Sequence, residues 1–137
     1  MVKRKKGAIV NIGSGAAIVV PSHPLYAIYA ASKAYVDQLS RSLYVEYKSL
    51  GIDVQCQVPL YVSTKMASQV ALVEKSSFLI PTANDYVKAA IRQIGYGSRC
   101  TPYWAHSLQW FFASLAPDYL LDSWRLSIGI RRRGQLV

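Results

Sequence analysis

The chain has 137 residues, 52% hydrophobic and 17% charged, which excludes a disordered or collagen-like polypeptide and allows one folded domain. Its net charge of +9 is concentrated at residues 3–6 and 125–133, so we expect solvated basic ends or contacts to an anionic surface, and no nucleic-acid interface. Two cysteines, Cys56 and Cys100, form neither a disulfide framework nor a zinc site, and we expect free thiols. No apolar run is long enough to predict a membrane-spanning helix, and no signal peptide is expected.

The first half of the chain predicts a strand, a helix and a second strand. Residues 7–12 (GAIVNI) are apolar and β-branched, as in a buried parallel strand. A glycine- and proline-containing loop over 13–24 leads to an uninterrupted helix over 25–50, which Gly51 caps. Residues 52–58 alternate apolar and polar side chains, as a second strand does. This βαβ unit predicts two parallel strands in one sheet.

The second half predicts shorter elements. A loop or short helix is expected over 64–74, followed by a helix with Asn84 as its N-cap and Gly95 or Gly97 as its stop. A further strand is expected over 99–103.

An aromatic, apolar tail covers residues 103–121 and ends its helical pattern at Pro117. Four large side chains lie at helical spacing: Trp104, Leu108, Phe111 and Leu115. The first interpretation is a helix that covers the core. The alternative is an interfacial helix that contacts a membrane surface through 103–133, with the arginines meeting anionic lipid.

Tyr29 and Lys33 are the candidate catalytic pair. Their i,i+4 spacing on the long helix places the phenol and the ammonium on one face. A neighbouring cation favours phenolate, so the tyrosine becomes a better acid for proton transfer to a carbonyl oxygen. Ser14 follows the first strand, at the end where ligands bind in parallel α/β sheets.

These residues resemble the short-chain dehydrogenase/reductase family. NIGS at 11–14 is similar to the family's strand with the catalytic serine, YAASK at 29–33 to its YxxxK motif, and VPLYVSTKM at 58–66 to its segment after the next strand. Leu60 stands where that segment usually has glycine. Within the family, the sequence of these segments is similar to that of the very-long-chain 3-oxoacyl-CoA reductases of plants.

The resemblance implies a function for each matching residue. Tyr29 would protonate the 3-oxo oxygen, Ser14 would bind the same oxygen, and Lys33 would lower the Tyr29 pKa and hold the nicotinamide ribose. Thr64 would contact the nicotinamide carboxamide. The cofactor implied is NADPH and the substrate a long-chain 3-oxoacyl-CoA, at the endoplasmic reticulum membrane, with elongation-complex proteins or a homo-oligomer as possible partners.

The glycine-rich turn that binds the dinucleotide in this family is absent from residues 1–137. We therefore expect one partial domain, the carboxyl-terminal half of a Rossmann-type doubly wound parallel sheet with a helical aromatic tail. Its first strand would form an exposed apolar edge.

Two alternatives to the reductase stay open. One is a truncated, catalytically silent fragment that associates with a full-length reductase. The other is an enzyme similar to the 17β-hydroxysteroid dehydrogenases, which share the YxxxK motif.

Overall fold

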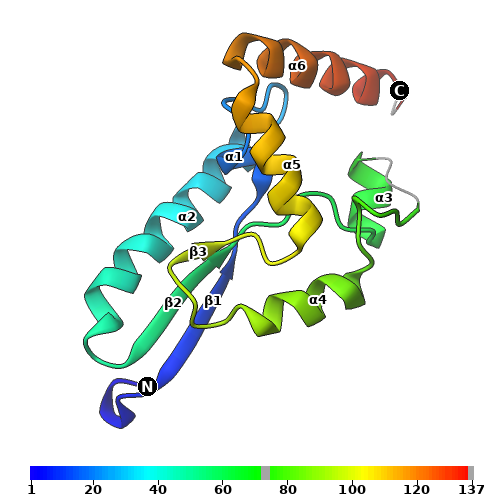
Figure 1. The fold of residues 1–137 in the computed structure, drawn as a ribbon. Helices are drawn as coiled ribbons and strands as arrows, with labels where there is room; N and C mark the ends of the chain where they lie inside the picture. Colours follow the sequence, from blue (N-terminus) through cyan, green and yellow to red (C-terminus); the bar gives the residue numbers. More distant parts are fainter. Residues whose placement is uncertain (72–74, 136–137) are drawn as a thin grey trace.

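A three-stranded parallel sheet organises the chain in the computed structural model, which describes residues 1–71 and 75–135 (Figure 1). The strand order is β1 (Gly7–Ile12), β2 (Ile52–Gln57) and β3 (Arg99–Cys100), with both neighbouring pairs parallel. The predicted α/β class and the parallel βαβ unit are therefore confirmed, although β3 is shorter than expected.

Helix α2 (Ala27–Lys48) is the crossover between β1 and β2. It begins two residues later than predicted because Leu25 has a φ of +67°, which is incompatible with a helix. The preceding loop contains a short helix, α1 (Gly15–Ile18), and a 3-10 turn, η1 (Val2–Arg4), precedes β1. Gly51 follows α2 with a φ of +73°, the left-handed conformation expected of a helix-ending glycine.

β2 is the centre of the core because helices cover both of its faces. Val54 and Cys56 lie on the side of α2, whereas Gln55 and Gln57 lie on the side of α4 (Ala83–Arg92). The alternating pattern of this strand therefore does not separate core from solvent. All four side chains are buried.

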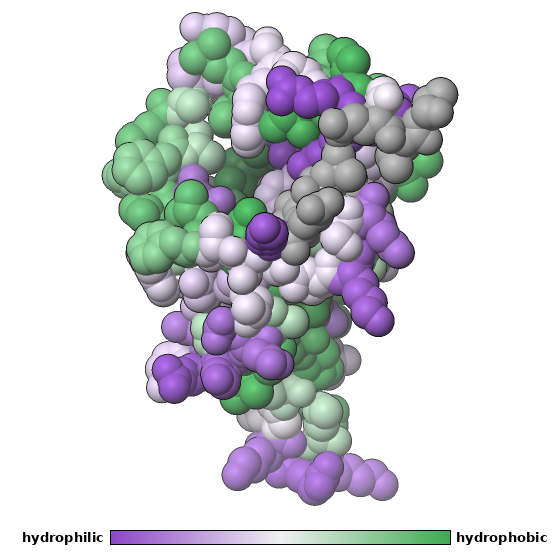
Figure 2. All heavy atoms as spheres, turned by 90° about the vertical axis from the view of Figure 1, so that its right-hand side faces the viewer, coloured by the Kyte–Doolittle hydropathy of each residue, from purple (hydrophilic) through white to green (hydrophobic). Residues whose placement is uncertain are grey.

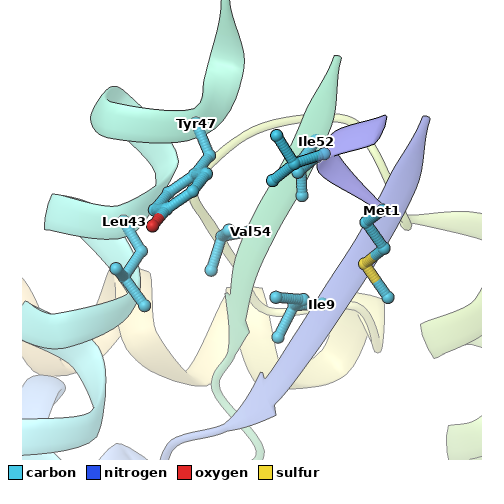
Figure 3. Close-up of a pocket in the computed structure, with 7 residues that line it drawn as sticks. Met1, Ile9, Leu43, Tyr47, Ile52 and Val54 are labelled. Atoms are coloured by element: carbon cyan, nitrogen blue, oxygen red, sulfur yellow. The ribbon is translucent and has the colours of Figure 1, made fainter. Parts of the chain in front are cut away.

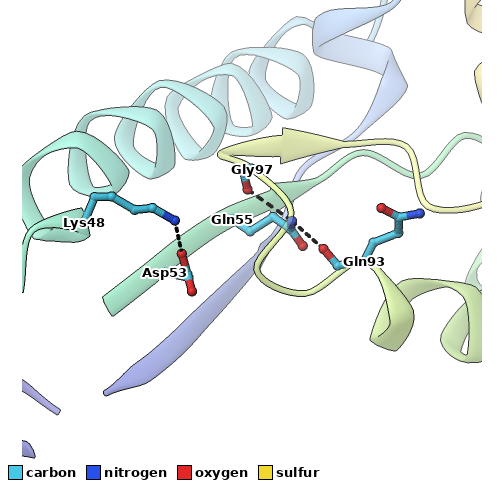
Figure 4. Close-up of polar contacts among 5 residues, drawn as sticks. All are labelled: Lys48, Asp53, Gln55, Gln93 and Gly97. Atoms are coloured by element: carbon cyan, nitrogen blue, oxygen red, sulfur yellow. Dashed lines mark hydrogen bonds and ion pairs between the residues drawn. The ribbon is translucent and has the colours of Figure 1, made fainter. Parts of the chain in front are cut away.

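The two buried glutamines are hydrogen-bonded to the carboxyl end of α4 and to the loop after it, and Figure 4 shows these contacts for Gln55. The Gln55 amide donates to the carbonyls of Gln93 and Gly97 over 2.8 and 3.1 Å. The Gln57 amide donates to Ala90 over 2.9 Å and to the Gln55 side chain over 3.0 Å. The Ala90 and Gln93 carbonyls also accept the backbone amides of Gln93 and Tyr96, and the glutamine amides add a second bond to each that holds α4 on the sheet.

The N-cap residue of helix α4 differs from the one predicted. Its N-cap is Thr82, whose hydroxyl accepts the Asp85 amide over 3.2 Å and donates to the Asp85 carboxylate over 2.7 Å. Asn84 is the second helical residue, so its predicted capping function is wrong. Both residue types cap helices, and the reciprocal bond with Asp85 favours the threonine. Helix α3 (Lys65–Ala71) lies within the predicted 64–74 segment, whose residues 72–74 are outside the described residues.

The tail forms two helices, α5 (Trp104–Leu115) and α6 (Asp118–Gln135), of which only the first was predicted. The side chains of the predicted apolar stripe are exposed by 40 to 66%: Trp104, Leu108, Phe111 and Leu115. The predicted stripe is therefore not the face that covers the core; α5 packs on the core through Ala105 and His106 on its other side. Within residues 1–71 and 75–135, no helix has both the length and the hydropathy needed to span a membrane.

β1 is an edge strand among the described residues, and its Ile9 and Ile12 are 40 and 48% exposed, as expected of an apolar edge. A shallow apolar pocket lies where β1 and β2 begin, lined by side chains from both strands, from α2 and from the start of the chain (Figure 3). This is the opposite end of the strands from Ser14, so the pocket is separate from the candidate catalytic residues. Cys56 and Cys100 are free thiols, as predicted.

Candidate active site

Tyr29 and Lys33 lie together on α2, as their spacing predicted. The Lys33 Nζ atom is 6.0 Å from the centroid of the Tyr29 ring. Tyr29 is 45% exposed, and a shallow pocket lined by residues 25–29 opens beside it. No hydrogen bond joins its hydroxyl to another side chain or backbone group in the described part of the chain. The phenol is thus available to an incoming ligand.

Lys33 also connects α2 to the end of β1. Its ammonium donates a hydrogen bond to the backbone carbonyl oxygen of Ile12 over 3.0 Å. Ile12 is the last residue of β1, and Ser14 follows two positions later. An ammonium has three donors, so two remain for a ligand at the carboxyl end of the sheet.

Ser14 is buried and is held from both sides. Its Oγ accepts the amide of Ala16 over 3.1 Å, as the N-cap of α1. The amides flanking it, of Gly13 and Gly15, donate to the carbonyls of Gln57 and Pro59 over 2.8 and 2.9 Å. These bonds attach the serine to the segment after β2. The Ser14 hydroxyl keeps its own proton for donation, because the capping bond uses only a lone pair.

Thr64 is exposed and caps α3 by accepting the Ala67 amide over 3.2 Å. Within the described residues, neither its side chain nor the Tyr29 hydroxyl is hydrogen-bonded to Ser14. The structure therefore brings Tyr29, Lys33 and the strand end leading to Ser14 together. It does not join Thr64 to them.

His106 holds the Pro59–Leu60–Tyr61 segment in place, and no sequence pattern predicts this contact. It is fully buried; its Nδ1 accepts the Leu60 amide over 3.3 Å and its Nε2 donates to the Tyr61 carbonyl over 3.1 Å. Burial lowers the pKa of His106, against the opposing effect of the Tyr61 carbonyl. The neutral ring matches this bonding, since one nitrogen accepts and the other donates.

Arg125 makes a second buried contact near the candidate site that no sequence pattern predicts. It is 7% exposed, so the prediction of a solvated basic end is wrong at this position. Its guanidinium reaches both ring nitrogens of His23, over 2.6 and 2.9 Å, and the hydroxyl of Tyr61 over 3.4 Å. Arg132 donates to the same hydroxyl over 2.9 Å. No local pattern indicated this contact, because the helix that carries Arg125 was itself not predicted.

These contacts dock α6 onto the loop between Ser14 and Tyr29. Ser22 donates to the Asp122 carboxylate, and Arg133 donates to the Leu25 carbonyl over 3.3 Å. Burial, followed by the charges of Arg125 and Arg132, lowers the pKa of His23 to about 4. Burial raises the pKa of Tyr61, but hydrogen bonds from the two arginines outweigh it and leave that pKa lowered.

Comparison with known proteins shows which family this chain is similar to. The family model for short chain dehydrogenases matches residues 1–75. A very-long-chain 3-oxoacyl-CoA reductase-like protein of Arabidopsis thaliana is 71% identical over 97% of this chain. The human inactive hydroxysteroid dehydrogenase-like protein 1 is 43% identical over 88% of this chain. The chain spans only 43% and 36%, respectively, of these relatives.

A solved structure supports the same assignment. A short-chain dehydrogenase from Sphingobium yanoikuyae, determined in complex with NADPH, matches with a TM-score of 0.60 and 26% identity. The match covers 88% of this chain and 47% of that protein. The fold described here is therefore part of a larger Rossmann-type arrangement in the proteins that it resembles.

Proposed function

Because this chain belongs to the short-chain dehydrogenase/reductase family, we propose that it carries the proton-donating part of an active site that reduces very-long-chain 3-oxoacyl-CoA to 3-hydroxyacyl-CoA. The name of the 71%-identical plant relative supports this substrate class. The NADPH complex of the bacterial dehydrogenase supports a nicotinamide cofactor.

One observation carries the proposal: Lys33 lies against Tyr29 and is hydrogen-bonded to the last residue of β1. This arrangement holds an ammonium between a phenol and the end of the strand that leads to a buried serine. Such a set can donate a proton to a carbonyl oxygen and stabilise the negative charge that develops there.

Each residue has a defined task in this reaction. Tyr29 donates its phenolic proton to the 3-oxo oxygen, and Ser14 donates a hydrogen bond to the same oxygen. The Lys33 charge favours the tyrosinate left behind, which lowers the barrier to proton transfer. NADPH, when bound, supplies the hydride.

The residues present fit the nicotinamide end of the cofactor. The two unused Lys33 donors suit ribose hydroxyls, and the open Tyr29 hydroxyl lies beside them. The Thr64 hydroxyl keeps a proton while it caps α3, so it retains the capacity to donate to the carboxamide. Selection of NADPH over NADH is carried by the resemblance alone.

The rest of the nucleotide site would come from outside residues 1–137. We place this chain as the carboxyl-terminal part of the domain, consistent with its span of 43% of the plant relative. By the same resemblance, we place it at the endoplasmic reticulum membrane, with elongation-complex proteins or further copies of the chain as partners.

The test is NADPH oxidation with a very-long-chain 3-oxoacyl-CoA by residues 1–137 joined to the amino-terminal part of the 71%-identical plant relative. Tyr29→Phe should abolish turnover, whereas Tyr35→Phe, at an exposed tyrosine of the same helix, should retain it. A 17β-hydroxysteroid is assayed in the oxidative direction beside it, and preferential steroid turnover would favour the hydroxysteroid alternative.

A second candidate function is a catalytically silent chain that acts by association with a full-length reductase. The 43% identity to a relative named inactive favours it. A chain that is folded by circular dichroism yet shows no turnover, and that co-purifies with a full-length reductase, would support this candidate over the enzyme.

A further inference from the structure

One face of helix α6 lies against the loop that leads into α2. Gly129 belongs to this face, and a Cβ there would lie 3.0 Å from the Cδ1 atom of Leu25. The missing side chain therefore allows the helix to approach the loop closely. Arg125 and Arg133, four residues to either side of Gly129, contact the same loop at His23 and Leu25. This face of α6 is thus held at the start of α2.

Three arginines gather on this face of α6. Arg125 is buried, and its partners are the imidazole of His23 and the phenol of Tyr61. Arg132 is half-buried, and its guanidinium carbon lies 5.3 Å from the centre of the Tyr61 ring. Arg133 is exposed. Among residues 1–71 and 75–135, both ion pairs lie elsewhere in the fold, so no described carboxylate is paired with these guanidinium groups. We call the three residues the α6 arginine cluster.

Two titratable groups show the effect of this positive charge. Burial, followed by the charges of Arg125 and Arg132, lowers the pKa of His23 to about 4. Burial raises the pKa of Tyr61, but hydrogen bonds from the same two arginines outweigh it and leave that pKa lowered. A positive potential disfavours an imidazolium and favours a phenolate. The same potential attracts an anionic ligand.

The arginine cluster keeps donors for such a ligand. A guanidinium has five N–H groups, and within the described residues Arg132 and Arg133 each use a single one, toward the Tyr61 hydroxyl and the Leu25 carbonyl. Paired N–H groups of arginine match the oxygen atoms of a phosphate. Figure 2 shows hydrophilic side chains, in purple, in the upper part of the molecule, at the height where Figure 1 places α6. This surface therefore suits a ligand that carries phosphate groups.

The arginine cluster lies at one end of the pocket beside Tyr29. Residues 25–29 line that pocket, and Arg133 binds the carbonyl oxygen of Leu25, the first of them. Four residues span at most about 14 Å of backbone, so one extended ligand can reach both the cluster and Tyr29. A coenzyme A thioester has this form, because its pantetheine arm separates the acyl group from a pyrophosphate and a 3′-phosphate.

We propose that Arg132 and Arg133 bind the phosphate groups of the coenzyme A thioester, with the charge of buried Arg125 beside them. The acyl thioester then reaches Tyr29 through the pocket at the start of α2. This inference rests on the proposed function, which places the pyrophosphate of the cofactor outside residues 1–137 and leaves the phosphates of the substrate for these arginines. Such binding positions the substrate from its non-reacting end.

Binding of coenzyme A, measured without turnover, is the first test. Isothermal titration calorimetry uses residues 1–137 joined to the amino-terminal part of the 71%-identical plant relative. Arg132→Gln with Arg133→Gln should weaken coenzyme A binding by about tenfold or more, because charge-assisted bonds to phosphate are lost. Arg41→Gln with Arg92→Gln removes the same charge at exposed positions of α2 and α4 and should leave the affinity unchanged.

Kinetics separate phosphate binding from the chemical step. In the Arg132/Arg133 variant, the KM for the 3-oxoacyl-CoA should rise by about tenfold while kcat stays unchanged, because the lost contacts act equally on the bound substrate and the transition state. The matching 3-oxoacyl-pantetheine thioester has no phosphate, so its KM should be the same in the variant and the unaltered protein. The Kd for NADPH should also be unchanged.

The titration of Tyr61 provides a readout that needs no arginine variant. A phosphate bound to Arg132 adds negative charge beside the phenol, so coenzyme A should raise the Tyr61 pKa, whereas pantetheine should not. Ultraviolet difference titration against a Tyr61→Phe protein isolates the signal. This measurement decides the question if circular dichroism shows that the Arg132/Arg133 variant is unfolded.

The proposal is wrong if coenzyme A binds the two double variants equally well, or if its binding leaves the Tyr61 pKa unchanged. Weaker NADPH binding with unaltered coenzyme A binding would also overturn it, because the arginines would then serve the phosphates of the cofactor. Failure of the reductase assignment gives a different result. Coenzyme A would still bind through the arginine cluster, which supports this inference, while no 3-oxoacyl-CoA is reduced.

Discussion

The ammonium of Lys33 is hydrogen-bonded over 3.0 Å to the carbonyl oxygen of Ile12, from the second turn of α2 to the last residue of β1. The bond joins the helix that carries Tyr29 to the strand that leads to Ser14. The bond thus connects the two groups that the proposed reaction requires at one carbonyl oxygen, through a residue whose charge would also favour the tyrosinate.

Lys33→Met should separate the structural effect of the lysine, its hydrogen bond to Ile12, from the electrostatic effect of its charge on Tyr29. Because the bond is partly exposed, its loss should lower the free energy of unfolding by no more than about 1 kcal/mol. Loss of the charge beside the phenol should lower kcat/KM for the 3-oxoacyl-CoA by about a hundredfold. Lys88→Met, at an exposed lysine of α4, is the control. Equal turnover by the two variants would contradict the assignment of Lys33.

Arg125→Ala should destabilise the docking of α6. The substitution removes the donor shared by His23 and Tyr61, and we expect the free energy of unfolding to fall by about 1 to 3 kcal/mol. Arg131→Ala, on the same helix but exposed, should change it by less than about 0.5 kcal/mol. Urea unfolding of both variants is the measurement, and similar losses would show that the buried contacts do not stabilise α6.

The same substitution should change the titration of Tyr61. Its pKa is lowered by hydrogen bonds from Arg125 and Arg132 that outweigh the effect of burial. Removing Arg125 takes away one of these donors, so the pKa should rise while Arg132 limits the increase. Ultraviolet difference titration of Arg125→Ala, with a Tyr61→Phe background to identify the signal, checks this.

The free energy of unfolding should decrease as the pH falls below about 6.5. The pKa of His23 is lowered to about 4, and that of His106 is also lowered, so the unfolded chain binds protons that the folded chain does not. Each histidine contributes a slope of at most about 1.4 kcal/mol per pH unit. The slope is smaller for half-buried His23, where solvent screens the charge. Urea midpoints at pH 7, 6 and 5 should fall in the unaltered chain and fall less steeply in His23→Asn, in which only His106 still contributes.

Gly51 should not tolerate a side chain, whereas Gly134 should. Gly51 has a φ of +73°, and a Cβ there would collide with the backbone oxygen of Lys5. Gly51→Ala should therefore cost about 2 kcal/mol or more. Gly134 lies in α6 with open space around it, so Gly134→Ala should stabilise the chain by about 0.5 to 1 kcal/mol. Thermal unfolding of the two variants should shift in opposite directions.

Local patterns were sufficient for the first half of the fold. β1 matches its predicted segment, and α2 and β2 lie within theirs, because strand period, helix period and a helix-ending glycine act over a few residues. The same locality explains the error at Asn84. Thr82 and Asn84 are both competent caps, and only the bond from Thr82 to Asp85 distinguishes them.

The sequence by itself determined that Tyr29 and Lys33 share a helix face, because helical geometry depends only on their spacing. Only the tertiary structure decided that Lys33 reaches Ile12, that His106 holds Leu60, and that Arg125 is buried against His23. It also decided that α5 turns its apolar side outward. These outcomes depend on contacts between residues far apart in the chain, and the free energy of such contacts is set by how the elements pack, which no local period records.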